Sequence, residues 1–153
     1  MKQPLIHIRE GRAEDVAVIA EYNQRMALET EDKVLDTVTV TKGVEQGLNL
    51  PEKCRYFVAE VRGTVIGQAM VTYEWSDWRN GDLWWIQSVY VHPDHRRQGI
   101  FKKIYQHIET LARDNSNVRG LRLYVEEENA EGQAVYTKLG MSHAGYHVYE
   151  REF

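Results

Sequence analysis

A cationic turn in the middle of the chain has the composition of an anion-binding site. Within a chain whose formal net charge is −4, the stretch VHPDHRRQGIFKKI (residues 91–104) concentrates basic side chains, at Arg96, Arg97, Lys102 and Lys103. Guanidinium groups match phosphate oxygens, and Gly99 in the turn lets a bulky group approach the backbone closely. A solvated basic helix start explains the same spacing equally well, because glycine-containing turns are common.

The sequence around this turn places it between a strand and a helix. Residues 83–91, LWWIQSVYV, are nearly continuously apolar, as in a central strand covered on both faces, and Pro93 would end that strand. Beyond Gly99, one helical face collects apolar residues, namely Ile100, Phe101, Ile104, Ile108, Leu111 and Ala112. The first turn of a helix leaves four amides unpaired and carries the positive end of the helix dipole. A turn at the carboxyl end of a parallel strand is also where open α/β sheets bind ligands.

The other elements predict a mixed sheet with helices. Alternating apolar residues predict strands at residues 5–10, 55–63, 64–75, 119–125 and 143–152. Apolar residues at helical spacing predict helices at residues 11–31, 36–48 and 131–139. Asn80-Gly81 is a strong hairpin signal, so the first strands are antiparallel. The strand, helix and strand in the middle imply a parallel pair joined by a right-handed crossover.

Composition sets the class of protein. A chain of 153 residues suits one domain, so we expect residues 1–153 to fold as a single unit. The one cysteine, Cys54, excludes an intramolecular disulfide and favours a reducing cytoplasm. We expect no signal peptide, membrane span or metal site, because no long apolar run and no histidine spacing supports one. A pI near 5.9 argues against nucleic acid as the main partner.

Two motifs carry a resemblance to a known family. RRQGIF, residues 96–101, resembles the Arg/Gln-x-x-Gly-x-Gly/Ala signature of the GNAT superfamily of N-acetyltransferases, and VYVHPDHR resembles the strand and turn before it. Asn129, Tyr136 and Gly140-Met141 match a second motif of that superfamily. The resemblance implies an α/β fold of mixed (α+β) type. It would be a single domain with a central mixed sheet of six to seven strands and about four helices.

The resemblance also implies acetyl-CoA as cofactor. The family holds the pyrophosphate on backbone amides of the turn, and the strand edge binds the acetyl carbonyl and pantetheine arm by main-chain hydrogen bonds. Carried over by position, the cofactor-binding residues are Val89, Tyr90, Val91, Arg96, Arg97, Gln98, Gly99, Ile100, Phe101, Lys102, Asn129 and Tyr136. Phe101 departs from the signature, which has Gly or Ala there. Its ring must point away from the cofactor for the turn to stay open.

By the same resemblance, Tyr136 is the general acid that protonates the departing CoA thiolate. Simple packing of a helix against the sheet is the alternative for Tyr136. Asn129 would bond the pantetheine arm, cap a helix, or do both.

A base is expected because an alkyl amine has a pKa of roughly 10 and must react unprotonated. Polyamine-type members of the family place an acidic residue in the strand before the turn, where this chain has Gln87-Ser88. We take Glu29 first as catalytic base, because the junction of the two N-terminal helices borders the acceptor cleft in this fold. The other candidates are Glu31, Glu74 and Glu126.

A cluster of tryptophans bears on the acceptor. Residues 73–87 hold Trp75, Trp78, Trp84 and Trp85 among acidic side chains. Aromatic faces beside carboxylates suit a cationic amine. Burial of the strand, cover for the hairpin and a dimer contact explain the same residues.

We therefore predict a cytoplasmic, acetyl-CoA-dependent N-acetyltransferase acting by direct transfer in a ternary complex. Its partner would be a small-molecule amine that is amino-acid-like, a diamine or a polyamine, and the protein could be a homodimer. The alternatives are a non-catalytic acyl-CoA-binding sensor, acetylation of a protein or peptide amine, and nucleic-acid binding through the basic residues, which fits the local charge but not the global one.

Overall fold

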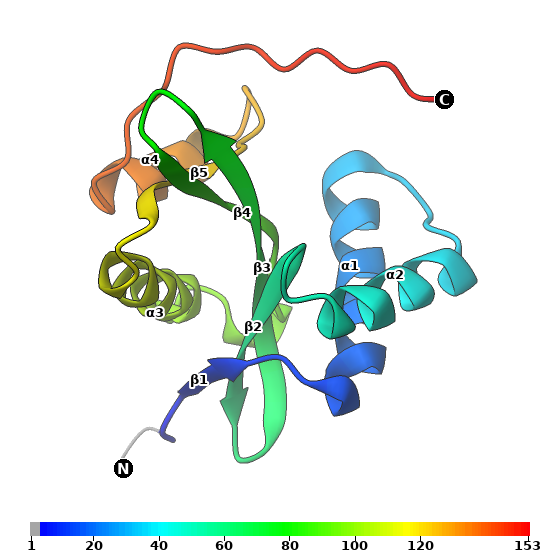
Figure 1. The fold of residues 1–153 in the computed structure, drawn as a ribbon. Helices are drawn as coiled ribbons and strands as arrows, with labels where there is room; N and C mark the ends of the chain where they lie inside the picture. The colour runs from blue at the N-terminus through cyan, green and yellow to red at the C-terminus, as the bar shows by residue number, and fades with distance from the viewer. Residues whose placement is uncertain (1–3) are drawn as a thin grey trace.

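A computed structural model describes residues 4–153 and shows one twisted sheet (Figure 1). The strands lie in the order β1-β2-β3-β4-β5, and only the β4–β5 pair is parallel. Their bounds are β1 His7–Glu10, β2 Cys54–Val61, β3 Thr64–Ser76, β4 Gly81–Val91 and β5 Val118–Leu123. The mixed α/β fold class predicted from the sequence is confirmed.

Helices cover both faces of the sheet. Figure 1 shows α1 and α2 on one side of the sheet and α3 on the other. Their bounds are α1 Val16–Glu31, α2 Thr37–Asn49, α3 Ile100–Asp114 and α4 Ala130–Lys138, with short 3-10 turns at η1 Ala13–Asp15 and η2 Pro93–His95. No helix within residues 4–153 is long and apolar enough to cross a membrane.

The core under α3 fixes where that helix begins. Its buried residues Ile100, Ile104 and Ile108 pack against strand residues that include Phe57. Each such side chain contributes roughly 1.5–3 kcal/mol on burial. A Cβ on Gly67 of β3 would lie 3.1 Å from Ile100 Cγ2, so glycine lets the first turn of α3 press against the sheet.

The predicted last strand is wrong. Residues 143–152 alternate in sequence, yet they form no strand, and the sheet has five strands instead of six to seven. No backbone hydrogen bond joins residues 142–153 to the rest of the part that the structure describes. Alternating apolar residues favour a β-strand, but a segment becomes one only when its backbone pairs with a neighbouring strand.

Candidate active site

Strands β4 and β5 diverge halfway along β4. Their parallel pairing begins at Asp82 with Val118 and ends at Ile86 with Leu123. β4 continues to Val91 and stays paired with β3 on its other side. Its last residues, 87–91, therefore carry backbone groups without a partner on β5. The edge expected to bind acetyl-CoA, Val89 to Val91, lies in this part.

A β-bulge at Ser88 marks the divergence. The register of β3 with β4 slips opposite Gln68–Met70, and Ser88 takes a left-handed φ of 52°. The Ser88 carbonyl accepts a 3.1 Å hydrogen bond from Gln68 Nε2, which also donates to Asn23 Oδ1 at 2.8 Å. Bulges of this kind occur next to functional sites.

The pairing of Gln68 with Asn23 was not predicted from the sequence. The signal was present, because Gln68 is the one polar residue in the run VIGQAMV. Gln68 is fully buried, and its Oε1 has no hydrogen-bond partner among residues 4–153.

The first turn of α3 presents free amides. Gly99 precedes the helix with a left-handed φ of 74°, and no side chain caps the helix. The Gly99 carbonyl accepts from the Lys103 amide at 3.1 Å, so the amides of residues 100–102 have no acceptor within the helix. A Cβ on Gly99 would meet nothing within 4 Å, so the space before the turn is open. This turn fits a pyrophosphate on physical grounds.

Arg96 turns away from these amides toward α1. Its Nε donates to the Val91 carbonyl at 2.9 Å, and its Nη2 donates to Glu29 Oε2 at 2.8 Å. The guanidinium also lies 5.2 Å from the centre of the Tyr90 ring. The exposed cations Arg97, Lys102 and Lys103 make no ion pair among the described residues, so no carboxylate neutralises their charges.

Glu29, the expected catalytic base, accepts hydrogen bonds from two residues of the site. Tyr90 donates its hydroxyl to Glu29 Oε1 at 3.0 Å, opposite the Arg96 contact. Burial alone would raise the pKa of Glu29, but the hydrogen bonds from Arg96 and Tyr90 lower it below its usual value. The carboxylate is therefore ionised at neutral pH and is a weaker base than a free glutamate.

Tyr136 of α4 lies beside the first turn of α3. Its ring centre is 5.8 Å from that of Phe101, and the two planes meet at 78°. Phe101 also contacts Tyr105 and packs against the core under α3, so its ring is directed into the helix interface. The turn stays open although a bulky residue occupies a position where the signature has a small one. Burial raises the pKa of the Tyr136 hydroxyl, which makes no hydrogen bond within residues 4–153.

Asn129 is the N-cap of α4. Its Oδ1 accepts from the Gly132 amide at 2.8 Å, which satisfies one of the free amides of that helix. The cap orients α4 and so places Tyr136. A role of Asn129 toward the pantetheine arm remains a prediction.

Comparison with known proteins identifies the family. The sequence profile of the acetyltransferase (GNAT) family matches residues 21–141, which is most of the chain. The chain belongs to this family. A crystal structure of a possible acetyltransferase from Clostridium difficile is 46% identical, covers 97% of this chain and 98% of its own, and superposes with a TM-score of 0.90.

More distant relatives agree with this assignment. A thialysine N-epsilon-acetyltransferase from Bos taurus is 26% identical over 88% of this chain and 83% of its own length. A predicted acetyltransferase from Clostridium acetobutylicum, solved with acetyl-CoA, has a TM-score of 0.79 at 17% identity and covers 96% of each chain, which supports the fold.

This GNAT protein is thus an acetyl-CoA-dependent N-acetyltransferase. The residues present fit that donor: free amides at α3, open space before Gly99, and a β4 edge without a β5 partner. When bound, acetyl-CoA supplies an acetyl thioester. The chain supplies the hydrogen-bond donors, the positive charge of the turn and a protonated phenol nearby.

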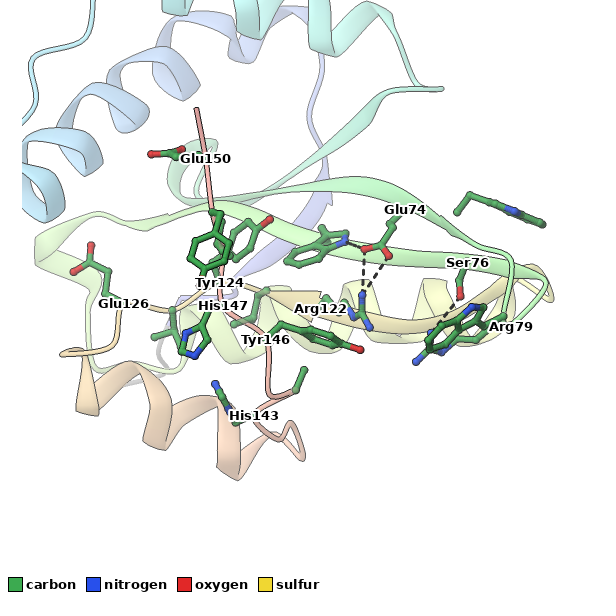
Figure 2. A pocket seen from close by; sticks show the side chains of 18 of the residues that line it. Glu74, Ser76, Arg79, Arg122, Tyr124, Glu126, His143, Tyr146, His147 and Glu150 are labelled. Atoms are coloured by element: carbon green, nitrogen blue, oxygen red, sulfur yellow. Dashed lines mark hydrogen bonds and ion pairs between the residues drawn. The ribbon is translucent and has the colours of Figure 1, made fainter. Parts of the chain in front are cut away.

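The acidic residue beside the tryptophans is already engaged. Glu74 Oε1 accepts from Trp85 Nε1 at 2.7 Å, and both its oxygens accept from Arg122 at 3.2 Å. Trp84 is buried, while Trp75 and Trp78 are exposed on the β3–β4 hairpin. The carboxylate of Glu74 is therefore occupied by contacts with other side chains of the sheet (Figure 2). The tryptophans lie partly in the core and partly on the surface.

The remaining candidate carboxylates are exposed and make no ion pair among residues 4–153. Glu126 is exposed after β5, and Glu31 is exposed at the end of α1. Burial raises the pKa of the Cys54 thiol, so this cysteine is unreactive. Residues 4–153 contain no group of three histidine, cysteine or acidic side chains that could hold a metal.

Proposed function

We propose that this acetyltransferase transfers the acetyl group to a primary amine of a small molecule by direct transfer in a ternary complex. The observation that carries the proposal is the meeting of three features. The end of β4 has an open edge, and the chain leads from there to the free amides at the start of α3. Tyr136 lies beside the first turn of α3, where its ring contacts Phe101. Donor binding, charge and a proton source are thus gathered on one side of the sheet.

We assign Tyr136 the role of general acid. The sulfur of the thioester leaves as a thiolate and needs a proton or a hydrogen bond as it forms. A phenol with a raised pKa keeps its proton throughout the neutral range. Its hydroxyl has no competing partner within residues 4–153, so the proton is available to the leaving group.

We assign Glu29 to binding of the acceptor amine. Its ionised carboxylate lies next to Tyr90 of β4 and attracts a protonated amine. Proton removal by Glu29, directly or through water, requires the Arg96 contact at 2.8 Å to loosen, because that ion pair lowers the basicity of the carboxylate.

The chemistry of the acceptor follows from charge and from one relative. A primary alkylamine is cationic in solution, and Glu29 provides the matching charge. The Bos taurus relative is named for acetylating the ε-nitrogen of thialysine, an amino-acid-like amine. We infer an acceptor that carries a primary amine on a flexible chain: an amino acid, a diamine or a polyamine. We also propose a cytoplasmic location and a homodimer.

A thiol-release assay over a panel of amines tests this function. Lysine-like amino acids, diamines, polyamines, an aminoglycoside and a lysine-containing peptide are offered at equal concentration with acetyl-CoA. We expect the highest kcat/KM for a small aliphatic amine. A preference for the peptide would replace the small molecule with a protein acceptor. Donor-dependent thermal stabilisation without release for any amine would leave a binding module instead of an enzyme.

A further inference from the structure

A glutamine lies in the middle of the buried strand β3, and its side chain reaches two other elements. Gln68 has no exposed surface and lies opposite Val58 of β2. The Ser88 carbonyl can only accept a hydrogen bond, so Nε2 of Gln68 is the atom that faces it. The second hydrogen of Nε2 is donated to Asn23 Oδ1 of α1. The two donors of Gln68 thus join β4 to α1 through the core.

Packing of the core does not require these amides. Two apolar side chains at positions 23 and 68 would pack without any polar atom to satisfy, whereas Gln68 Oε1 is buried without a hydrogen bond among residues 4–153. A buried acceptor that is left unpaired lowers stability. Residues that break a packing rule in a folded protein occur mainly at functional sites. The two hydrogen bonds of Nε2 are therefore what the glutamine adds.

The hydrogen bond to Ser88 supports a strained backbone. Two residues of β4, Ser88 and Val89, lie opposite the single residue Ala69 of β3. Ser88 has a left-handed φ of 52°, which residues other than glycine adopt at a cost. Such a conformation persists only where neighbouring groups hold it. Gln68 Nε2, 3.1 Å from the Ser88 carbonyl oxygen, is a group in position to do so.

The bulge determines the direction of the rest of β4. Pairing with β5 ends at Ile86, and the bulge follows at Ser88. A bulge bends its strand and redirects the groups beyond it. Residues 89–91, the edge expected to bind the acetyl end of the donor, therefore take their direction from Ser88.

Buried contacts also hold α1 against this edge. Tyr22, next to Asn23, donates its hydroxyl to the Val65 carbonyl of β3 at 2.6 Å. Its ring centre lies 5.0 Å from that of Tyr90, which in turn donates to Glu29. The residue proposed to bind the acceptor and the edge expected to bind the donor are thus connected through α1, β3 and β4.

We propose that Gln68 is a positioning residue of the acetyl transfer. Together with Asn23 it holds the bulge at Ser88, and so directs the main-chain groups of residues 89–91 toward the thioester. The inference rests on the proposed place of the donor along this edge. Gln68 is buried and acts only through the backbone of Ser88. Its loss should lower kcat and change KM for acetyl-CoA little, because the pyrophosphate is expected at the amides of α3.

Replacing the polar pair with apolar residues separates this role from packing. Asn23→Leu/Gln68→Met exchanges each amide for an apolar side chain of similar shape. We expect the midpoint of urea unfolding to stay near that of the unmodified protein, while kcat falls by about tenfold or more. Val44→Ala, which removes buried atoms from α2, should lower the midpoint and keep kcat. An unchanged kcat in the double variant overturns the proposal, and so does an equal loss of kcat in Val44→Ala.

A second substitution tests whether Gln68 acts through Ser88. Glycine adopts a left-handed backbone without the usual cost, so Ser88→Gly should favour the bulge in the absence of the glutamine. Added to Gln68→Met, it should recover a large part of the lost kcat. No recovery would mean that Gln68 acts elsewhere and would end the proposal.

Hydrogen exchange examines the donor edge without an acceptor, so its result is independent of the proposed acceptor class. Acetyl-CoA should slow exchange at residues 87–91 and at residues 99–103 of the unmodified protein. In Gln68→Met the first effect should weaken and the second should remain. No slowing at residues 87–91 of the unmodified protein, or undiminished slowing there in the variant, contradicts the proposal. An amine panel without thiol release, with these exchange results intact, would remove only the acceptor class.

Discussion

The ring of Phe101 stands against the ring of Tyr136, with centres 5.8 Å apart and planes at 78°. An edge-to-face pair of this kind adds about 0.5–1.5 kcal/mol beyond burial. The pair joins the first turn of α3 to α4. Phe101, which departs from the family signature, therefore also packs against the proposed general acid. A bulky side chain at this position is compatible with donor binding because it fills the helix interface.

Removing that ring should loosen Tyr136 and leave the amides of the turn in place. We expect Phe101→Ala to lower the free energy of unfolding by about 2 kcal/mol, below the range for fully buried phenylalanines, because the ring is only partly buried. The kcat should fall while KM for acetyl-CoA changes little. Phe101→Leu, which keeps most of the volume, should recover most of the stability. Urea unfolding and steady-state kinetics measure both effects, and a rise in KM alone would place the ring in the donor site.

Tyr136→Phe tests the proton source. General acid catalysis contributes typically about 10²–10⁴-fold, so we expect kcat to fall within that range while acetyl-CoA still raises the melting temperature. Because burial raises the pKa of Tyr136 from its usual value, no loss of activity from its ionisation is expected between pH 6 and about 9. Unchanged turnover in the phenylalanine variant would leave Tyr136 a packing residue. Tyr105→Phe, at a buried tyrosine of α3 that also contacts Phe101, is the control.

Glu29→Gln separates charge attraction from proton removal. The pKa of Glu29 is lowered in the folded protein. The ionised carboxylate therefore stabilises the fold at pH values above its unfolded-state pKa, and this stabilisation is lost as the pH falls through its folded-state pKa. The difference in melting temperature between the two proteins should therefore vanish in acid. If Glu29 draws the amine, KM for the acceptor rises at neutral pH. If it removes a proton, kcat falls and the acid limb of the pH profile disappears.

Asp15 should make the protein sensitive to acid. Burial would raise its pKa, but hydrogen bonds from the Arg9 side chain at 2.7 and 2.9 Å and from the Arg12 amide at 2.8 Å lower it. This carboxylate therefore stabilises the fold above the unfolded pKa near ~3.9, and the stabilisation is lost as pH falls below that value. Asp15→Asn should cost about 3 kcal/mol at pH 7 in urea unfolding, because it leaves the partly buried Arg9 with only one of its two carboxylate partners. Asp36→Asn, which keeps an N-cap acceptor on the exposed start of α2, should cost far less.

Periodicity in the sequence predicted every helix and the first five strands of the described chain. The helical face from Ile100 to Ala112 and the apolar run in β4 needed only local spacing to be recognised. The last strand failed because its partner is not encoded near it, and alternation alone cannot supply one. That residues 1–153 form a single domain stays a prediction.

Long-range contacts in the site were beyond the sequence. Arg96 and Glu29 are 67 positions apart, and nothing local says that the arginine leaves the turn for α1. The direction of Phe101 and the bulge at Ser88 likewise depend on how packed elements meet. The residue types of the turn were readable, whereas their partners required the fold.

Where β4 diverges from β5, the groups available to bind the donor are main-chain N–H and C=O groups, which do not depend on the side chain. The groups at residues 87–91 and at the start of α3 belong to the main chain, so side-chain substitutions there leave them in position. Ser88 and Gly99 are exceptions because their backbones are left-handed. Sequences can therefore drift apart while the donor stays the same, and the acceptor can change through side chains alone.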